Sequence, residues 1–457
     1  MRKMHLTENL LLKTYDTWTV FVEELRRIFH DPGIIMIFFV ACLAYPVLYK
    51  CIYWKNNITD VPVAVVDMSC SPESRRFIYE WNACPEVKVA YNCANMEDAE
   101  HLLRSRKVHG IMYFPPDYAA ILHGGLETAH ISLYCDMSSF LFMKNVYLSA
   151  NKVLLDKMYT IQIDRYRAMN MDENLSWAIV QSAPYEENTL FCPSNGYGDF
   201  LVPAVLVMII HQTLLFGIAM LSGTACEENE AVFILPKRRR RYSILRILFG
   251  RSAAYFVVYL ALASYALIFI PYVFDLPHIG QVGDILRFMI PFLLSTIFFS
   301  IALGSIQKER ETGMVTMLFT SLIFLFLSGV SWPAVSLPPV WRYLGWLLPS
   351  TWGINGYLHI QSMGATLATT AREYHALWIL TAVYFAVCCI IFLIGSRKHA
   401  QRAKAGLLDN DYDEKVIAEM MRQREQEMAK ALGMRIEHLF KTAKEQITAP
   451  REQDRTN

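Results

Sequence analysis

Long apolar runs divide the chain, and each is long enough to cross a lipid bilayer. A membrane-spanning helix needs roughly 20 apolar residues. Six runs approach or meet that length: Ile34–Tyr53, Phe200–Leu221, Ala253–Val273, Ile285–Ile306, Met314–Val330 and Ala376–Ile394. Charged residues gather at their ends, which disfavours the alternative of buried core helices in a soluble protein. The pattern predicts a polytopic α-helical membrane protein with one transmembrane helix in residues 33–54 and five more in residues 200–395.

In the segment between the first two runs, residues 55–199, the hydrophobic positions recur with a different period. Four short stretches are rich in β-branched and aromatic residues, as strands are: "VPVAVVD", "EVKVAYN", "HGIMYFP" and "AHISLYCD". Helices are predicted between them, with Ser71 and Asn95 as N-caps. A long helix from about Ser139 to Met169 is too polar to cross a membrane. Strands that alternate with helices predict a small α/β domain inserted between spans 1 and 2.

Both ends of the chain are polar. In residues 1–32, apolar side chains recur every three or four positions, at Leu11, Tyr15, Trp18, Val22, Leu25 and Phe29. This stripe predicts an amphipathic helix that lies in the membrane interface or packs on the protein's own spans, and the two interpretations are compatible. "HDPG" at residues 30–33 ends that helix and turns the chain into the first span. Residues 396–457 are predicted to form a charged helix and tail outside the membrane.

Composition supports this picture, and the charge distribution orients it. Hydrophobic residues make up 54% of the chain and charged residues 19%, whereas soluble domains carry about a quarter charged residues. The net charge of +1 gives no sign of a nucleic-acid partner. Lys and Arg concentrate before the first run, after the second and the fourth, and after the sixth. Because such loops are cytoplasmic, both termini are predicted to be cytoplasmic and residues 55–199 to form an external domain.

Few side chains in the chain point to a chemical role. His211 lies well inside the second run, and an intramembrane ionisable group is a candidate for a transport pathway; a hydrogen bond to a neighbouring helix is the alternative. Lys50 is expected to extend to the external interface. Cys84 and Cys93 flank a predicted strand and are a candidate disulfide, which an external compartment permits. The chain has no C-x-x-C pair, so we predict no metal site and no catalytic residue.

The stretch Leu327–Tyr357, "LSGVSWPAVSLPPVWRYLGWLLPSTWGINGY", is apolar but repeatedly interrupted. Its prolines break any continuous helix, and "VWRYLGWLL" predicts an amphipathic helix too short to cross. Irregular chain is tolerated at membrane depth only when it is buried in protein or lines a wet cavity, and tryptophans favour the headgroup level. We predict a re-entrant hairpin, about residues 331–360, in the outer leaflet before the last span. A loop lying flat on the external surface is the alternative.

This stretch, together with the order of spans and insert, resembles the ABC-2 family of ABC-transporter permeases. In that family a span ends in a small-residue turn, followed by a Pro, a P-x-W element, and L-x-P-x-T with a Gly shortly after. The matching residues are Ser328, Gly329, Pro333, Pro339, Trp341, Pro349, Thr351 and Gly356. The large domain after the first span is similar to that of the multidrug and secretion-type branch. The resemblance covers about residues 8–400.

The loop after the second span departs from the family pattern, which usually has a Glu-Arg-Glu-like cluster followed by Gly-Thr. Here the loop has an acidic and a basic cluster without the Gly-Thr: Glu227, Glu228, Glu230, Arg238, Arg239, Arg240 and Arg241. A "KERETG" run occurs instead at residues 308–313. The resemblance implies that the two clusters couple the chain to an ATPase. Attraction of the four arginines to anionic lipid headgroups is a compatible alternative.

The resemblance implies a permease subunit of an ATP-driven exporter in the inner membrane of a bacterium. The chain has no G-x-x-x-x-G-K-[ST] phosphate loop, so ATP and Mg²⁺ would bind to a separate ATPase, and no cofactor is expected on this chain. The family's arrangement implies two ATPase subunits and a second permease chain, identical or related, within membrane lipid. The cargo is not identified. The alternative function is a non-transporting receptor or scaffold that displays the external domain.

Overall fold

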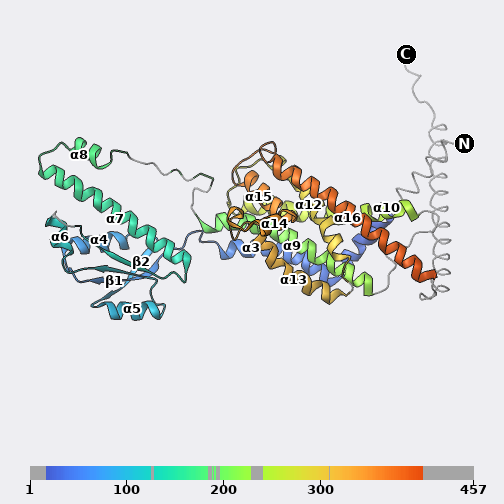
Figure 1. Cartoon of the computed structure of the whole chain (residues 1–457), viewed down its shortest axis with the longest axis horizontal. Helices are drawn as coiled ribbons and strands as arrows, with labels where there is room; N and C mark the ends of the chain where they lie inside the picture. Colours follow the sequence, from blue (N-terminus) through green and yellow to red (C-terminus); the bar gives the residue numbers. More distant parts are fainter. Residues whose placement is uncertain are drawn as a thin grey trace, which may run out of the picture.

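The computed structural model describes residues 17–124, 128–183, 188, 190–191, 196–227, 240–307 and 309–404. They form an α/β domain and a helical bundle, which lie end to end (Figure 1). We call the α/β part, residues 61–180, the insert domain. The first part of the predicted N-terminal helix, residues 1–16, and the tail from residue 405 onward lie outside the described residues.

The insert domain is built on a four-stranded sheet in the order β2-β1-β3-β4. Strand β1 (Val61–Asp67) pairs in parallel with β2 (Val87–Cys93) and with β3 (Gly110–Phe114). Strand β4 (Ser132–Cys135) is antiparallel to β3. The valine-rich sequence of β1 suits a central strand that is covered on both faces. The four stretches predicted as strands therefore all form strands of one sheet.

Helices cover both faces of this sheet: α4 (Pro72–Asn82), α5 (Met96–Arg104), α6 (Tyr118–Gly124) and α7 (Phe140–Ala168). Helix α8 (Glu173–Val180) packs on α7. Successive side chains of a strand point to opposite faces. Val63 and Val65 therefore pack with α4 and α7, whereas Ala64 and Val66 pack with α5. The Ser71 side chain caps α4, in agreement with the sequence pattern.

The predicted Cys84–Cys93 disulfide is wrong, because both thiols are free. Cys84 precedes β2 and Cys93 is its last residue. A strand rises about 3.3 Å per residue, so the six steps from Val87 to Cys93 span roughly 20 Å, and a turn at Cys84 precedes them. Disulfide-bonded cysteines have Cα atoms at most about 7 Å apart. Proximity in the sequence misled the prediction because a strand separates the two cysteines.

Among the described residues, the bundle contains six helices that are long and apolar enough to cross a membrane, at residues 32–52, 197–227, 244–273, 282–304, 310–327 and 371–395. The first combines α2 (Pro32–Ile35), a π-helical segment η1 (Met36–Ala41) and α3 (Cys42–Ile52). The third combines α10 (Arg240–Ser264), η3 (Tyr265–Phe269) and α11 (Ile270–Val273). The others are α9 (Tyr197–Glu227), α12 (Val282–Gly304), α13 (Arg310–Leu327) and α16 (Ala371–Lys404). The predicted set of six spans is confirmed.

Helices α9 and α12 form the centre of the bundle. The most apolar segments of these two helices are 83% and 78% buried, whereas the corresponding segment of α13 is only 18% buried. Helix α13 packs on α9 along one side, and its other side exposes large apolar residues such as Leu318, Phe319 and Leu322. Exposed apolar rows of this kind suit contact with lipid. The chain is therefore a multi-pass membrane protein with two inner helices and an outer layer.

The bundle has two ends, which we name by their relation to the insert domain. The insert end holds the end of α3 and the starts of α9, α12 and α16 (Figure 1). It also holds a 3₁₀ turn η4 (Ala334–Ser336) and the short helices α14 (Pro339–Trp346) and α15 (Pro349–Gln361). The far end holds the helix of residues 17–30, the starts of α2, α10 and α13, and the end of α9.

Candidate functional site

At the far end, the amphipathic helix of residues 17–30 packs on the middle of α10. A Cβ atom added to Gly250 would lie 2.8 Å from the Thr17 carbonyl oxygen and 2.9 Å from the Val20 side chain. Only glycine permits so close an approach. Ile28 is fully buried on this side, and Trp18 and Phe29 remain exposed. The helix therefore rests on the protein's own spans, and exposed apolar side chains are still available to the membrane interface.

A buried charge fixes this contact. Glu24, whose side chain is 4% exposed, forms an ion pair of 3.1 Å between its Oε1 and Nε of Arg251. The hydroxyl of Tyr255 donates a hydrogen bond to the same carboxylate, and Arg27 lies 3.8 Å from its other oxygen. A charge removed from water requires such partners. Helix 17–30 and α10 are thus joined by a network that would be disrupted if either helix moved alone.

A second ion pair joins the first span to α13. Asp31 caps α2, accepting hydrogen bonds from the backbone N–H groups of Gly33 (2.8 Å) and Ile34 (3.3 Å). Its Oδ1 also accepts a hydrogen bond of 2.8 Å from Nη2 of Arg310, and Nη1 of Arg310 lies within hydrogen-bond distance of Oδ2. The Arg310 hydrogen bond lowers the pKa of the Asp31 carboxyl. The carboxylate is therefore ionised throughout the physiological pH range.

Arg310 also links α13 to the end of α9. Its Nη1 donates to Oγ1 of Thr224 (3.2 Å), and its backbone N–H donates to Oε1 of Glu227 (2.8 Å). Glu227 thereby satisfies one of the free N–H groups at the start of α13 and places negative charge at the positive end of that helix. The start of the first span, the end of α9 and the start of α13 meet at this one guanidinium.

Of the residues predicted for coupling, the structure brings Glu227 into this network. Glu228, Glu230, Arg238 and Arg239 lie outside the described residues. Arg240 and Arg241 begin α10, and their side chains are not described. Sequence reasoning missed the charges that form the network: Glu24, Asp31, Arg251 and Arg310. The available signal was the occurrence of opposite charges beside the ends of different apolar runs.

His211 lies in the middle of α9 and is fully buried. Its ring lies between Phe299 and Phe324, with ring centroids 5.9 Å from each. Neither ring nitrogen has a hydrogen-bond partner among the described residues. A hydrogen bond to a neighbouring helix is the alternative role expected for His211. The structure shows such a bond from the next residue, since Nε2 of Gln212 donates to the Ser321 carbonyl of α13 (3.2 Å).

The Pro- and Trp-rich stretch forms a chain of short elements after α13. Gly329 has a φ of +86°, which glycine adopts readily, and Pro333 precedes η4. Pro339 occupies the first turn of α14. Trp341 on α14 remains exposed. The predicted short amphipathic helix is therefore present as α14.

Helix α15 packs antiparallel to α12. Pro349 begins α15, and Oγ1 of Thr351 donates a hydrogen bond to the Leu327 carbonyl (3.4 Å). Gly356 contacts the ring of Phe288, and at the end of α15 the Gln361 carbonyl accepts a hydrogen bond from the backbone of Ile279 (2.9 Å).

The insert end has its own ion pair, where the chain leaves and re-enters the bundle. Nζ of Lys50 lies 3.5 Å from Oδ1 of Asp199, and both side chains are 6% exposed. Nδ2 of Asn56 donates to Oδ2 of the same carboxylate (2.9 Å). The ammonium of Lys50 therefore reaches toward the insert end, where its partners Asp199 and Asn56 enclose it.

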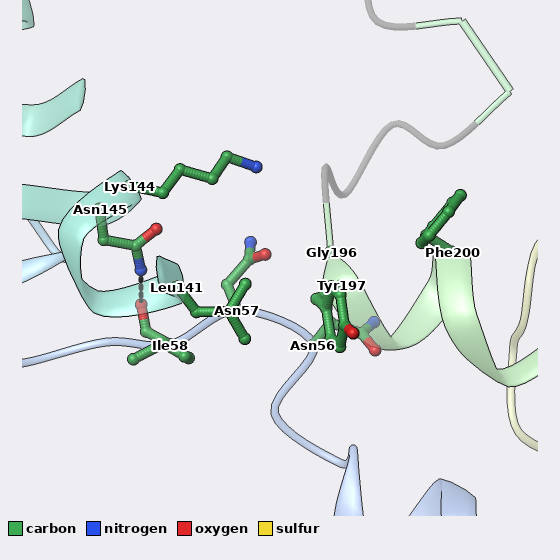
Figure 2. Close-up of a pocket in the computed structure, with 9 residues that line it drawn as sticks. All are labelled: Asn56, Asn57, Ile58, Leu141, Lys144, Asn145, Gly196, Tyr197 and Phe200. Atoms are coloured by element: carbon green, nitrogen blue, oxygen red, sulfur yellow. Dashed lines mark hydrogen bonds between the residues drawn. The ribbon is translucent and has the colours of Figure 1, made fainter. Parts of the chain in front are cut away.

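A pocket of about 300 Å³ lies beside this ion pair, between the bundle and the insert domain. The first turns of α7 and α9 form its sides and residues 56–58 its floor (Figure 2). Within the described residues, no group of three or more His, Cys, Asp or Glu side chains is arranged to hold a metal ion.

Comparison with known families completes this description. The six helices of the described residues that can span a membrane define a polytopic α-helical membrane protein. A family model described as ABC-2 family transporter protein matches residues 33–390, most of the 457 residues. The chain therefore belongs to the ABC-2 family and is an ABC-2 type permease. No curated protein matches the chain.

Proposed function

We propose that this chain is the permease subunit of an ATP-driven exporter, powered by a separate ATPase that docks at the far end of the bundle. The observation that carries the proposal is the far-end network of Glu24, Arg251, Asp31, Arg310 and Glu227 in a chain of the ABC-2 family. In this proposal the far end and both termini are cytoplasmic, and the insert domain is external. The charge distribution of the loops favours this orientation, and membership of the ABC-2 family suggests the inner membrane of a bacterium.

The network supplies a route for movement from the ATPase into the membrane. A push on helix 17–30 would reach α10 through the ion pair of Glu24 with Arg251. A push on the loop that begins after Glu227 would reach α13 through Arg310, which also bonds to Asp31 of the first span. Because Glu227 bonds to the backbone N–H of Arg310 and Asp31 bonds to the guanidinium of the same residue, displacement of the loop would move the first span and α13 together. ATP and Mg²⁺ would bind to two ATPase subunits.

The transport pathway would lie between two permease chains, either identical or related. The weakly buried helix α13 and the buried, unpaired imidazole of His211 beside it favour a pathway on that side of the bundle. An imidazole in an apolar site without a hydrogen-bond partner among the described residues is costly, so a polar group of a cargo that reached it would relieve the cost.

Residues 331–360 would form a re-entrant hairpin in the outer leaflet. The support is the antiparallel packing of α15: Gly353 meets Phe292, whereas Gln361 reaches Ile279, just before α12 begins. At about 1.5 Å per residue, Gly353 therefore lies about 15 Å further along α12 than Val282. Cysteines introduced at Trp341 and Trp346 should react only partially with a membrane-impermeant thiol reagent. Rapid, complete labelling of both would instead favour a flat external loop.

Purification of the tagged chain from its native membranes tests the main proposal. We expect an ATPase subunit with a phosphate loop to copurify and the complex to hydrolyse ATP, with no hydrolysis by the chain alone. Hydrolysis by the isolated chain in lipid vesicles would contradict the proposal.

The acidic cluster allows a sharper test. Replacement of Glu227, Glu228 and Glu230 together by Gln should reduce transport strongly while the ATPase still turns over, because the cluster begins the proposed docking loop. Transport can be followed as the difference in compound accumulation between cells with and without the chain. Glu97→Gln, an exposed glutamate of the insert domain, is the matched control and should transport normally. Normal transport by the triple variant would remove the cluster from the mechanism.

A further inference from the structure

The pocket between the bundle and the insert domain has the position of a lipid-headgroup site. It lies beside the first turn of α9 and just beyond the end of α3, the points where two membrane spans reach the insert end. Aromatic side chains surround this level: Tyr197, Phe200 and Trp54 are all exposed. Tyr and Trp concentrate at the boundary between lipid and water. The pocket therefore opens at the membrane surface.

The lining of the pocket combines one positive charge with amides and apolar walls. Lys144 is exposed on α7, and its ammonium makes no hydrogen bond or ion pair in the part of the chain that the structure describes. Figure 2 shows the Lys144 and Asn57 side chains extending into the space between the two helices, with Phe200 on the opposite side. None of the nine lining residues is acidic. Asp199, which precedes the lining residue Phe200, is already paired with Lys50.

The pocket is held open by bonds on both sides, so it does not depend on the ligand. Nδ2 of Asn145 donates to the Ile58 carbonyl (2.8 Å), which fixes the floor to α7. The backbone N–H of Tyr197 donates to the Asn56 carbonyl (3.1 Å), which fixes the floor to α9. The volume of about 300 Å³ is at the lower end of the usual range for small-molecule sites. It suits a headgroup rather than a whole lipid.

We propose that this pocket binds the phosphate-bearing headgroup of an anionic membrane lipid, with Lys144 as its counter-charge. The amide of Asn57 would donate hydrogen bonds to the phosphate or glycerol oxygens. Leu141 and Phe200 would contact the first part of an acyl chain that remains in the outer leaflet. A lipid at this position touches the insert domain and the bundle at once, and it stabilises their relative arrangement. The site does not require that the chain export anything.

Site-resolved crosslinking tests the proposal on the full-length protein. The probe is a photoactivatable phosphatidylglycerol, with its reactive group on the acyl chain next to the headgroup, mixed into phosphatidylcholine nanodiscs. We expect crosslinks in the peptides that contain Leu141 and Phe200. Each basic residue near a membrane surface contributes about 1 kcal/mol to the attraction of anionic lipid. Lys144→Gln should therefore weaken labelling about fivefold, and Lys144→Glu about thirtyfold.

The controls separate this site from general attraction to lipid. Lys152→Glu changes another exposed lysine of α7 that does not line the pocket, and it should label like the wild type. The same photoactivatable group on phosphatidylcholine should label these peptides weakly. Undiminished labelling of Lys144→Glu, or equal labelling by phosphatidylcholine, would overturn the proposal. Displacement of the probe by an equal concentration of glycerol 3-phosphate would identify a soluble phosphate ester as the ligand and overturn the lipid assignment.

Discussion

The two ends of the bundle use ion pairs in different ways. At the insert end, Lys50 and Asp199 are both 6% exposed and join two neighbouring helices, α3 and α9. At the far end, Asp31 and Arg310 are 17% and 31% exposed, and Arg310 also bonds to Thr224 and Glu227. The first arrangement is enclosed and joins α3 and the nearby Asn56 to α9. The second is accessible and shared among three chain segments.

This difference indicates at which end of the bundle the ion-pair partners can rearrange more easily. A buried pair is strongly destabilised when one partner is lost or moves, so the insert end favours a fixed joint beneath the insert domain. A partly exposed pair contributes less because water screens it, and its partners can exchange at little cost. The far end is therefore the better place for another polypeptide to act. The buried pair of Glu24 and Arg251 is the exception there, and it fixes helix 17–30 to α10.

The largest effect is expected for Asp199→Ala. The substitution leaves the ammonium of Lys50 buried without its carboxylate, which costs about 3–5 kcal/mol in free energy of unfolding. Thermal unfolding of the purified protein in detergent measures the loss. The double variant Lys50→Met with Asp199→Leu is the control, because replacing both charges by apolar side chains should recover most of the stability. If Asp199→Ala were as stable as the wild type, the insert end would not be a fixed joint.

The second effect concerns the buried pair at the far end. Glu24→Ala should lower the free energy of unfolding by about 3 kcal/mol, which is at the low end of the range for a broken buried ion pair. The loss should appear locally, as faster amide hydrogen exchange in residues 17–30 and no change in α12. Glu24→Gln can still bond to the Tyr255 hydroxyl and should lose less protection. Uniform loss across the bundle would mean that Glu24 supports the whole fold rather than the docking of one helix.

The third effect separates the two ends quantitatively. A double-mutant cycle of Asp31→Asn with Arg310→Gln should give a coupling free energy of about 1 kcal/mol, because the pair is partly exposed. The corresponding cycle of Lys50→Met with Asp199→Leu should give a larger value. Both are measured as free energies of unfolding in the same detergent. Equal coupling energies at the two ends would refute the contrast drawn between them.

The smallest effect is a pH dependence at the far end. Hydrogen bonding from Arg310 lowers the pKa of Asp31 in the folded protein, so the ionised carboxylate adds to the free energy of unfolding. This contribution of Asp31 is fully present above the ordinary carboxyl pKa of 3.8. It is lost as the pH falls through the lowered value. The difference in melting temperature between the wild type and Asp31→Asn should thus be constant from about pH 8 to 5 and shrink below about pH 4. A difference that declined near neutral pH would point to another titrating group.

The elements themselves could be predicted from the sequence because their signals are local. A run of about 20 apolar residues is a membrane span wherever it occurs, and all six runs became helices of the bundle. Ser71 and Asn95 cap α4 and α5 because a cap depends on residues one turn away. Gly329 and Pro349 marked the breaks around the short helices for the same reason.

The candidate site could be predicted only in part, because its contacts are not local. Glu227 was found from its place in a charged loop, but its partner Arg310 lies 83 positions further along the chain. Asp31 and Arg310 are 279 positions apart, and nothing in either segment specifies the other. The Cys84–Cys93 prediction was wrong because a short separation in the sequence does not give a short distance across an extended strand.

The sequence by itself determined the number of spans, the α/β character of the insert domain, the interrupted stretch after the fifth span and the family. Hydrophobic periodicity and capping act within one or two turns, so the chain specifies them without knowledge of its neighbours. Only the tertiary structure decided that Lys50 pairs with Asp199, that Glu24 and Arg310 join separate helices, and that a pocket opens beside α9. Those outcomes depend on which helix ends meet, which is set by how α9 and α12 pack at the centre of the bundle.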